Sequence, residues 1–207
     1  MLKNTPIDKT LITGVILAGG RATRMGGQDK GLVLLNGQYM IDYVITALRP
    51  QVGELLISAN RNIEDYAQIG QCPVLTDTFG HYDGPLAGMA TALAAAKTDY
   101  VLFTPCDSPQ VSSQLAQRLS SRLIETGAQV SVADDGSRLH SVFSLLKRSL
   151  LTDLLAFLKS GERSIQRFFA RTQLARADFS DIPETLLNIN TASEHAALAA
   201  TAVRKYL

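Results

Sequence analysis

A glycine pair followed by basic side chains, within residues 17–30, is the part of this chain best suited to chemistry. Gly19 and Gly20 carry no side chains, so backbone N–H groups around them can approach an anion closely. Positive charge is supplied downstream, against the single carboxylate of Asp29, by Arg21, Arg24 and Lys30. Accessible backbone N–H groups and a lysine at the end of the loop can bind the phosphates of a nucleoside triphosphate. The segment predicts a phosphate-binding loop, and the alternative is a surface turn after a core strand.

The residue order in this segment excludes the two common phosphate loops. It lacks the G-x-x-x-x-G-K-[ST] order of a P-loop, and it lacks the G-x-G-x-x-G order of dinucleotide-binding folds. This argues against a P-loop ATPase. It also counts against a dinucleotide-dependent oxidoreductase, for which no clear hydride-transfer residue is present.

A proline-flanked aspartate, Asp107 in the run Thr104–Pro109, is the second candidate. Prolines on both sides stiffen the turn that follows an apolar run at 100–104. Magnesium prefers hard oxygen ligands, usually one or two carboxylates with phosphates and water. Asp107 is therefore a candidate magnesium ligand, and the alternative is an ordinary cap of the following turn.

A third candidate combines Asp77 with the run at 84–88. The Asp77 carboxylate can accept from both the N1–H and the N2–H₂ donors of guanine, which cytosine does not offer. Gly84-Pro85 opens a helix, and the free N–H groups at a helix start favour an anion. The alternative is a loop before an ordinary helix.

Apolar runs and helical patterns alternate along the chain and predict the elements that position these motifs. We expect strands at 15–18, 55–59, 74–76, 100–104, 129–133, 142–147 and 174–179. We expect helices at 39–52, 86–97, 115–124, 150–158, 165–171 and, after a T-x-x-E capping box, 191–204. This alternation predicts an α/β fold with three α/β/α layers and a mostly parallel, twisted sheet. Ligands then bind beyond the carboxyl ends of the strands, where the three motifs lie.

Length and composition narrow the class of protein. The 207 residues fit one domain, 1–207, and the 20 basic against 19 acidic residues do not suggest a nucleic-acid partner. Only Cys72 and Cys106 are present, without metal-ligand spacing, so we expect a reduced, cytoplasmic protein. No apolar run approaches the ~20 residues of a membrane span, so no membrane association is expected.

Several motifs together resemble the molybdenum cofactor guanylyltransferase (MobA) family of nucleotidyltransferases. The first loop matches L-A-G-G-x-x-x-R-M-G followed by an Asp-Lys pair, and 105–109 matches P-C-D-x-P. The run at 84–88 matches G-P-L-A-G, while 161–163 and 188–191 are similar to G-E-R and N-x-N-T elements. The resemblance covers about residues 13 to 200 and implies a Rossmann-like nucleotidyltransferase fold. It also implies transfer of GMP from Mg²⁺-GTP to the phosphate of molybdopterin, with release of pyrophosphate.

The resemblance also implies roles for individual residues. Catalytic groups would be Lys30, Arg24 and Asp107, with Asp107 as the metal ligand. Nucleotide-binding residues would be Leu17, Ala18, Gly19, Gly20, Lys30, Ser58, Asn60, Asp77, Gly84, Pro85, Leu86, Ala87, Gly88 and Asp107. Acceptor-binding residues would be Arg163, Asn188 and Asn190. The nucleotide-binding half would span about 13–110 and the acceptor-binding half about 111–200.

One departure and several alternatives stay open at this point. Ser58 stands where the family often has the first Asn of N-x-N, so base contact at Ser58 is in question. The alternatives are a cytidylyltransferase acting on molybdopterin or on a sugar or alditol phosphate, and a non-catalytic nucleotide-binding module. The cofactor expected is Mg²⁺, and the partners are GTP and molybdopterin. We expect a monomer that contacts other molybdenum cofactor biosynthesis proteins transiently.

Overall fold

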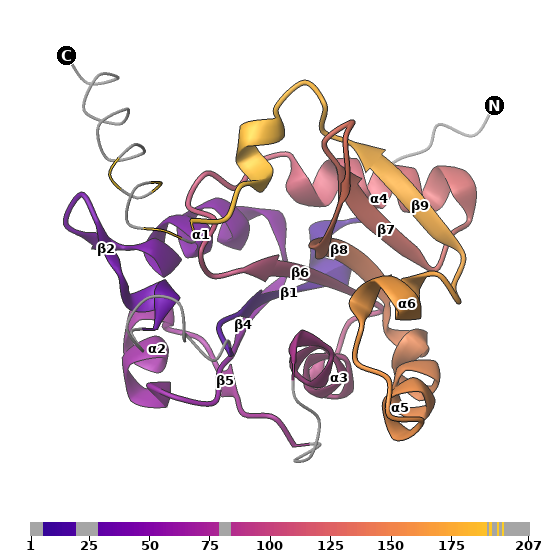
Figure 1. Cartoon of the computed structure of the whole chain (residues 1–207), viewed down its shortest axis with the longest axis horizontal. Coiled ribbons are helices and arrows are strands. Elements are labelled where there is room, and N and C mark those ends of the chain that lie inside the picture. The colour runs from indigo at the N-terminus through magenta and orange to yellow at the C-terminus, as the bar shows by residue number, and fades with distance from the viewer. Residues whose placement is uncertain are drawn as a thin grey trace.

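The centre of the computed structural model is a seven-stranded sheet in the order β5-β4-β1-β6-β8-β7-β9 (Figure 1). The structure describes residues 6–19, 29–78 and 84–189, together with residues 191, 194 and 196. A separate two-stranded hairpin joins β2 (Leu34–Leu35) to β3 (Gln38–Tyr39).

Parallel strands form the half of the sheet that carries the first two motifs. They are β1 (Ile12–Leu17), β4 (Glu54–Ser58), β5 (Val74–Leu75) and β6 (Tyr100–Pro105). β1 lies between β4 and β6 and pairs in parallel with both, while β4 pairs in parallel with β5. β1 is buried along nearly its whole length, as expected of a parallel strand covered on both faces. All four strands therefore end at one edge of the sheet.

The other half of the sheet contains one reversed strand. Its strands are β7 (Val130–Asp134), β8 (Leu139–Lys147) and β9 (Leu174–Asp178). β8 runs antiparallel to both β6 and β7, whereas β7 and β9 are parallel. β7 and β8 are joined by a tight turn in which the Asp135 carboxylate accepts hydrogen bonds from the backbone N–H groups of Ser137 and Arg138. So short a connection can join only antiparallel strands.

Helices cover both faces of the sheet, which confirms the predicted three-layer α/β/α fold (Figure 1). One face carries α1 (Met40–Leu48), α2 (Ile63–Gly70) and α4 (Leu115–Thr126). The opposite face carries α3 (Pro85–Ala95), α5 (Leu151–Lys159) and α6 (Ile165–Phe169). Each face has its own hydrophobic cluster, so the sheet is buried between two cores.

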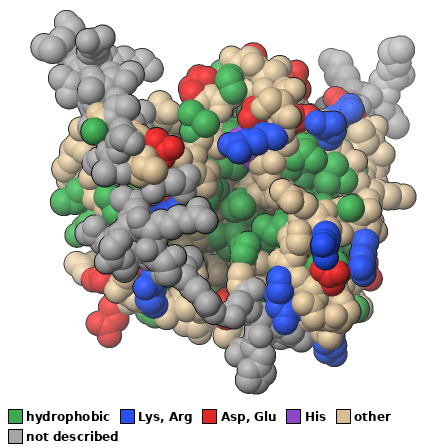
Figure 2. All heavy atoms as spheres, viewed as in Figure 1, with side chains coloured by type: hydrophobic (Ala, Val, Ile, Leu, Met, Phe, Trp, Pro, Cys, Tyr) green, Lys and Arg blue, Asp and Glu red, His purple; other side chains and the backbone are tan. Residues whose placement is uncertain are grey.

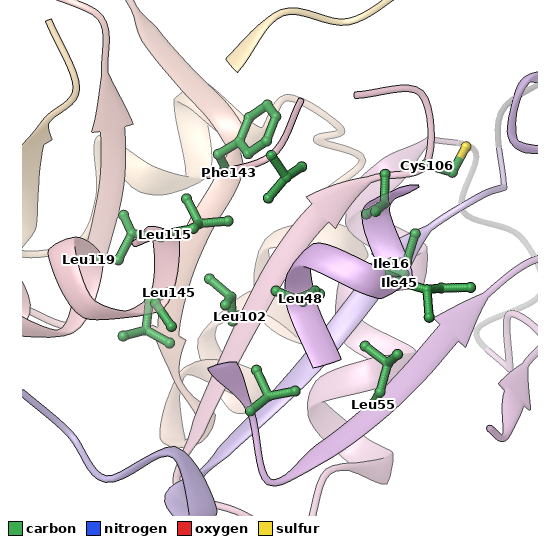
Figure 3. Packing of buried hydrophobic residues seen from close by; sticks show 14 of the residues in the cluster. Ile16, Ile45, Leu48, Leu55, Leu102, Cys106, Leu115, Leu119, Phe143 and Leu145 are labelled. Atoms are coloured by element: carbon green, nitrogen blue, oxygen red, sulfur yellow. The ribbon is translucent and has the colours of Figure 1, made fainter. Parts of the chain in front are cut away.

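Branched side chains fill the core beneath α1 and α4. Figure 3 shows Ile45 and Leu48 of α1 beside Leu55 of β4, all within one buried cluster. Further along the sheet, α4 places Leu115 and Leu119 against residues of β6 and β8. Cys106 lies at the end of this cluster, where β6 leaves the sheet.

Small side chains bring α3 close to the sheet on the other face. Every residue from Leu86 to Leu93 is buried, and alanine or glycine occupies four of these positions. A helix apolar on all sides belongs inside a protein, and short side chains let its backbone approach the strands. The start of α3 is therefore held firmly beside the carboxyl ends of β1 and β4.

Two short elements were not predicted from the sequence, namely α2 and the β2–β3 hairpin. Both are too short to show a clear hydrophobic period, and α2 buries only Tyr66 and Gly70 fully. The predicted helix at 191–204 lies largely outside the described residues. Its capping box is confirmed: Thr191 N donates to Glu194 at 3.0 Å, and Glu194 N donates to the Thr191 hydroxyl at 3.2 Å.

The surface of this view carries charges of both signs, and hydrophobic side chains gather in a hollow near its centre (Figure 2). Basic side chains lie along the rim of that hollow. No helix within the described parts of the chain is long and apolar enough to cross a lipid bilayer.

Candidate functional site

A cavity of about 670 Å³ opens beyond the carboxyl ends of β1, β4 and β6. Predicted site residues that line it are Leu17, Ala18, Gly19, Lys30, Ser58, Asp77, Gly84, Pro85, Gly88, Asp107, Arg163 and Asn188. Predicted residues outside the described part of the chain are Gly20, Arg24 and Asn190. The fold thus brings all three motifs to one cavity, as the rule for open α/β sheets requires.

An ion pair between Lys30 and Asp107 lies in this cavity. The Lys30 Nζ is 2.9 Å from Asp107 Oδ2, although 77 residues separate them in the sequence. The Lys30 side chain is 26% exposed and the Asp107 side chain 7%, so the ammonium can be reached from the cavity while the carboxylate is nearly enclosed. A cation and a carboxylate therefore meet inside the cavity at the ends of the parallel strands.

Asn188 holds the other oxygen of the Asp107 carboxylate. Its side-chain amide donates to Asp107 Oδ1 at 3.0 Å, and its own carbonyl oxygen accepts from the Ser108 hydroxyl at 3.1 Å. The backbone N–H of Ile189 donates to the Asp107 carbonyl oxygen at 2.8 Å. The segment near residue 188, predicted to bind the acceptor, thus also orients the candidate metal ligand.

Asp77 is fixed by a reciprocal pair of hydrogen bonds with Asn60. The Asn60 amide donates to Asp77 Oδ2 at 2.8 Å, and the Asp77 backbone N–H donates to Asn60 Oδ1 at 2.9 Å. Asn60 is not among the described residues that line the cavity, and its side chain instead contacts Asp77, which does line it. The arrangement points one carboxylate into the cavity at the end of β5.

The first turn of α3 closes the cavity on the side of Asp77. Gly84 has a φ of 105°, which favours glycine, and Pro85 occupies the first helical turn. Gly84, Pro85 and Gly88 line the cavity, whereas Leu86 and Ala87 are fully buried in the protein. The positive end of the α3 dipole therefore faces the cavity and favours an anion there.

Gly88 must lack a side chain because Ser58 lies against it. A Cβ on Gly88 would lie 2.7 Å from Ser58 Oγ and 3.6 Å from Asp77 Oδ1. We expect Gly88→Ala to destabilise the protein by about 1–3 kcal/mol, the usual range for overpacking, despite the better helix propensity of alanine. Thermal unfolding measures this, and the double variant Ser58→Ala/Gly88→Ala, which removes the clashing oxygen, is the control. A double variant no more stable than Gly88→Ala alone would contradict the clash.

Arg163 lines the cavity from the turn between α5 and α6. Its guanidinium donates to the carbonyl oxygens of Leu158 at 2.9 Å and Glu162 at 2.7 Å, and so caps the end of α5. Arg163 therefore adds a positive charge to the lining of the same cavity as Leu17 and Lys30.

Four lining residues, Asp29, Pro105, Cys106 and Val142, were not among the predicted site residues. Burial raises the pKa of the Cys106 thiol, and the carboxylates of Asp107 and Asp29 raise that pKa further. Cys106 is therefore a protonated thiol at neutral pH and a poor nucleophile. Asp29 stood out in the sequence only as the acidic residue of a basic loop.

The described residues contain no cluster of three or more His, Cys, Asp or Glu side chains that could hold a metal ion by themselves. A cation bound at Asp107 would depend on oxygens from substrate and water. This is the usual way in which Mg²⁺ is held in nucleotide sites.

Comparison with known proteins gives a family match over most of the chain. The model of the MobA-like NTP transferase domain matches residues 14–177. A protein of Shewanella putrefaciens named molybdenum cofactor guanylyltransferase is 48% identical over 183 residues, 88% of this chain and 93% of its own length. A protein of the same name from Vibrio vulnificus is 43% identical over 188 residues, 91% of this chain and 95% of its own length.

Solved structures show the same fold at lower identity. Molybdopterin-guanine dinucleotide biosynthesis protein A from Archaeoglobus fulgidus has a TM-score of 0.79 and 17% identity, covering 93% of this chain and 99% of that one. A nucleotidyl transferase from Methanothermobacter thermautotrophicus has a TM-score of 0.74 and 22% identity, covering 94% of this chain and 99% of that one. These likenesses confirm the nucleotidyltransferase fold.

Proposed function

Because this chain belongs to the MobA-like NTP transferase family, we infer that it is a nucleotidyltransferase that transfers GMP from GTP to the phosphate of molybdopterin. Pyrophosphate leaves, and the product is the guanine dinucleotide form of the molybdenum cofactor. Relatives that share this name match the chain along about nine tenths of its length, which supports the complete reaction.

The observation that carries the proposal is the Lys30–Asp107 pair inside the cavity at the ends of the parallel strands. The attacking group is a phosphate monoester that is already anionic near pH 7, so it needs no general base. The difficulty is that one anion must approach another, and catalysis rests on positioning and on neutralising charge. Lys30 supplies a fixed cation for this, and Arg24 is proposed to supply a second.

The phosphates are proposed to lie between the end of β1 and the start of α3. The backbone amides at Gly19 and Gly20 would hold the β- and γ-phosphates, with the helix dipole of α3 favouring the same charge. The Ala18 N–H, which the sequence also offered for this role, instead donates to the Ser58 carbonyl oxygen at 2.8 Å. Gly19 leaves room for this, since the nearest atom of the described residues to a Cβ there would be 3.7 Å away, on Asn60.

Magnesium is proposed as the cofactor, with Asp107 as its protein ligand. Its carboxylate offers hard oxygens, lines the cavity and is held in place by Lys30 and Asn188. When bound, the ion would neutralise charge on the phosphate that is transferred and on the leaving pyrophosphate. Asn188 would keep the Asp107 carboxylate aimed into the cavity whether or not the nucleotide is present.

Guanine is proposed to bind at Asp77, with Asn60 and Ser58 beside it. The Asn60 pair leaves the carboxylate little freedom to turn, so its acceptor direction is set before the base arrives. Two N–H groups of guanine can then donate to one carboxylate, as no cytosine edge can. The Ser58 hydroxyl is shorter than the family's Asn and is held close to Gly88.

We expect Asp77→Ala to bind GTP about 100-fold more weakly, because a site built to accept guanine N–H groups then leaves them unpaired. Titration of the wild type and the variant with Mg²⁺-GTP, Mg²⁺-ITP and Mg²⁺-CTP measures this. ITP lacks the 2-amino group, so the wild type should bind it more weakly than GTP, and the variant should no longer distinguish the two. Selective binding of CTP by the wild type would contradict the guanine site and would indicate a cytidylyltransferase instead.

Pyrophosphate release from GTP in the presence of molybdopterin tests the whole reaction. Release that requires molybdopterin supports GMP transfer, and release without it would indicate hydrolysis instead. Wild-type protein that releases no pyrophosphate although it binds GTP would favour a non-catalytic nucleotide-binding module.

The acceptor is proposed to contact Arg163, Asn188 and Asn190, which belong to the second half of a single domain. The nucleotide-binding half would be about residues 13–110 and the acceptor-binding half about 111–200. We further propose a monomer of the reducing cytoplasm that meets other molybdenum cofactor biosynthesis proteins transiently. Two free cysteines, Cys72 and Cys106, support the reducing compartment.

A further inference from the structure

A buried network of hydrogen bonds surrounds Asp29, the residue before Lys30, and has no role in the proposed reaction. The hydroxyl of Tyr66, on α2, donates to Asp29 Oδ1 at 2.5 Å. The side-chain amide of Asn62 donates to Asp29 Oδ2 at 3.3 Å. Tyr66 is fully buried, and Asp29 is 7% exposed where it lines the cavity. A carboxylate that precedes Lys30 in the chain is thus held by two donors from another element.

The position of Asp29 is unfavourable unless its carboxylate is held. Burial of a charge is costly without hydrogen-bond partners, and a carboxylate in a phosphate site repels the ligand. Burial raises the pKa of Tyr66, and the hydrogen bond to the Asp29 carboxylate raises that pKa further. Its hydroxyl therefore keeps its proton at every physiological pH and always donates to Asp29.

The backbone around Lys30 is fitted closely to the same tyrosine. A Cβ on Gly31 would lie 2.6 Å from the Tyr66 hydroxyl oxygen and 3.3 Å from the Cβ of Cys106. The backbone carbonyl oxygen of Asp29 accepts from the Leu32 backbone N–H at 3.0 Å and so begins a short 3₁₀ turn, Lys30–Leu32. The turn that carries Lys30 is therefore held between Tyr66 on one side and the Cys106–Asp107 segment on the other.

We propose that Tyr66 is a positioning residue for the transfer reaction, which acts through Asp29 to hold the Lys30 ammonium beside Asp107. The proposal rests on the proposed function, in which Lys30 neutralises phosphate charge. With the hydroxyl in place, the Asp29 carboxylate is bound to Tyr66 through one oxygen and to Asn62 through the other. Without the hydroxyl, that carboxylate keeps only the longer hydrogen bond from Asn62, so it is freer to turn and to compete with the phosphates for Lys30.

Tyr66→Phe tests this, because it removes one oxygen atom and keeps the buried ring. We expect kcat to fall about 10- to 100-fold, while KM for GTP changes less than about threefold. Tyr43→Phe is the matched control: the Tyr43 hydroxyl donates at 2.8 Å to the Leu35 carbonyl oxygen, and neither residue lines the cavity. It should keep wild-type kcat. Unchanged kcat in Tyr66→Phe, or an equal loss in both variants, would overturn the proposal.

A double-mutant cycle separates positioning of Lys30 from a general structural role. In a Lys30→Ala background, Tyr66→Phe should lower kcat less than about twofold further, because the group that Tyr66 positions is gone. An equal fold loss in both backgrounds would show that Tyr66 acts independently of Lys30 and would contradict the proposal.

A measurement on the protein alone distinguishes failure of this proposal from failure of the proposed function. In protein labelled with ¹³C at lysine Cε, the Lys30 signal, assigned by its loss in Lys30→Ala, should shift in Tyr66→Phe and stay in place in Tyr43→Phe. An unmoved Lys30 signal in Tyr66→Phe would refute the proposal. If the Lys30 signal shifts in Tyr66→Phe but the wild-type protein does not transfer GMP, the proposed function is wrong and the contact through Asp29 is still supported.

Discussion

Replacing Lys30 with alanine should lower kcat for pyrophosphate release by about 10²- to 10³-fold while the protein stays folded. Removal of one preorganised electrostatic group from an active site typically costs this much. The Lys30 side chain lies in the cavity, outside both hydrophobic clusters, so its loss leaves the cores intact. The single fixed cation described beside Asp107 would be gone at the moment when negative charges must approach one another.

The controls for this variant separate charge from folding. Lys97→Ala removes an exposed lysine after α3, away from the cavity, and should leave kcat unchanged. Circular dichroism and thermal unfolding verify that Lys30→Ala is folded. Lys30→Arg keeps the charge on a differently shaped group and should recover part of the activity. Turnover close to wild type in Lys30→Ala would rule out a catalytic role for this residue.

Asp107→Asn should reduce kcat by about 10³-fold or more and weaken the dependence of the rate on Mg²⁺ concentration. Asparagine keeps the shape of the side chain but loses the negative charge that a divalent cation requires. Its amide also cannot accept from both Lys30 and Asn188, which the carboxylate does with its two oxygens. Rates measured across a series of Mg²⁺ concentrations report both effects in one experiment.

Asp99→Asn, an exposed aspartate before β6, is the matched control and should behave as wild type. The double variant Lys30→Ala/Asp107→Asn should lose less activity than the product of the two single losses, because the residues share one ion pair. An Asp107→Asn enzyme with the wild-type magnesium profile would show that the metal is held elsewhere.

Much of the fold follows from local patterns in the sequence. Parallel strands buried on both faces appear as continuous apolar runs, such as β1 and β6, and both were predicted within a few residues. The start of α3 was marked by Gly84-Pro85, and the structure places Pro85 in the first turn. These features depend on neighbours in the chain, so the sequence contains what is needed to recognise them.

The candidate site was predicted in the same way, as short motifs at the ends of strands. Asp77 and Asp107 each follow an apolar run, and the rule that ligands bind at the carboxyl ends of strands brings their loops together. The rule does not predict which side chains of different loops contact one another. The pairing of Asn60 with Asp77 joins residues 17 apart, and no local pattern distinguishes it from an ordinary loop contact.

The sequence by itself determined the fold class, because the spacing of apolar residues and the positions of glycine and proline act over a few residues. It also predicted a phosphate-binding loop, most of which lies outside the described residues, and the carboxylates of the candidate site. Only the tertiary structure decided that β8 is reversed, that Asn188 holds Asp107 across 81 residues, and that Tyr66 holds Asp29 across 37. The reason is physical: these contacts depend on how whole helices and strands pack against one another. The type of a side chain determines which hydrogen bonds it can make. The packing of helices and strands that are distant in the sequence determines which partner lies within reach.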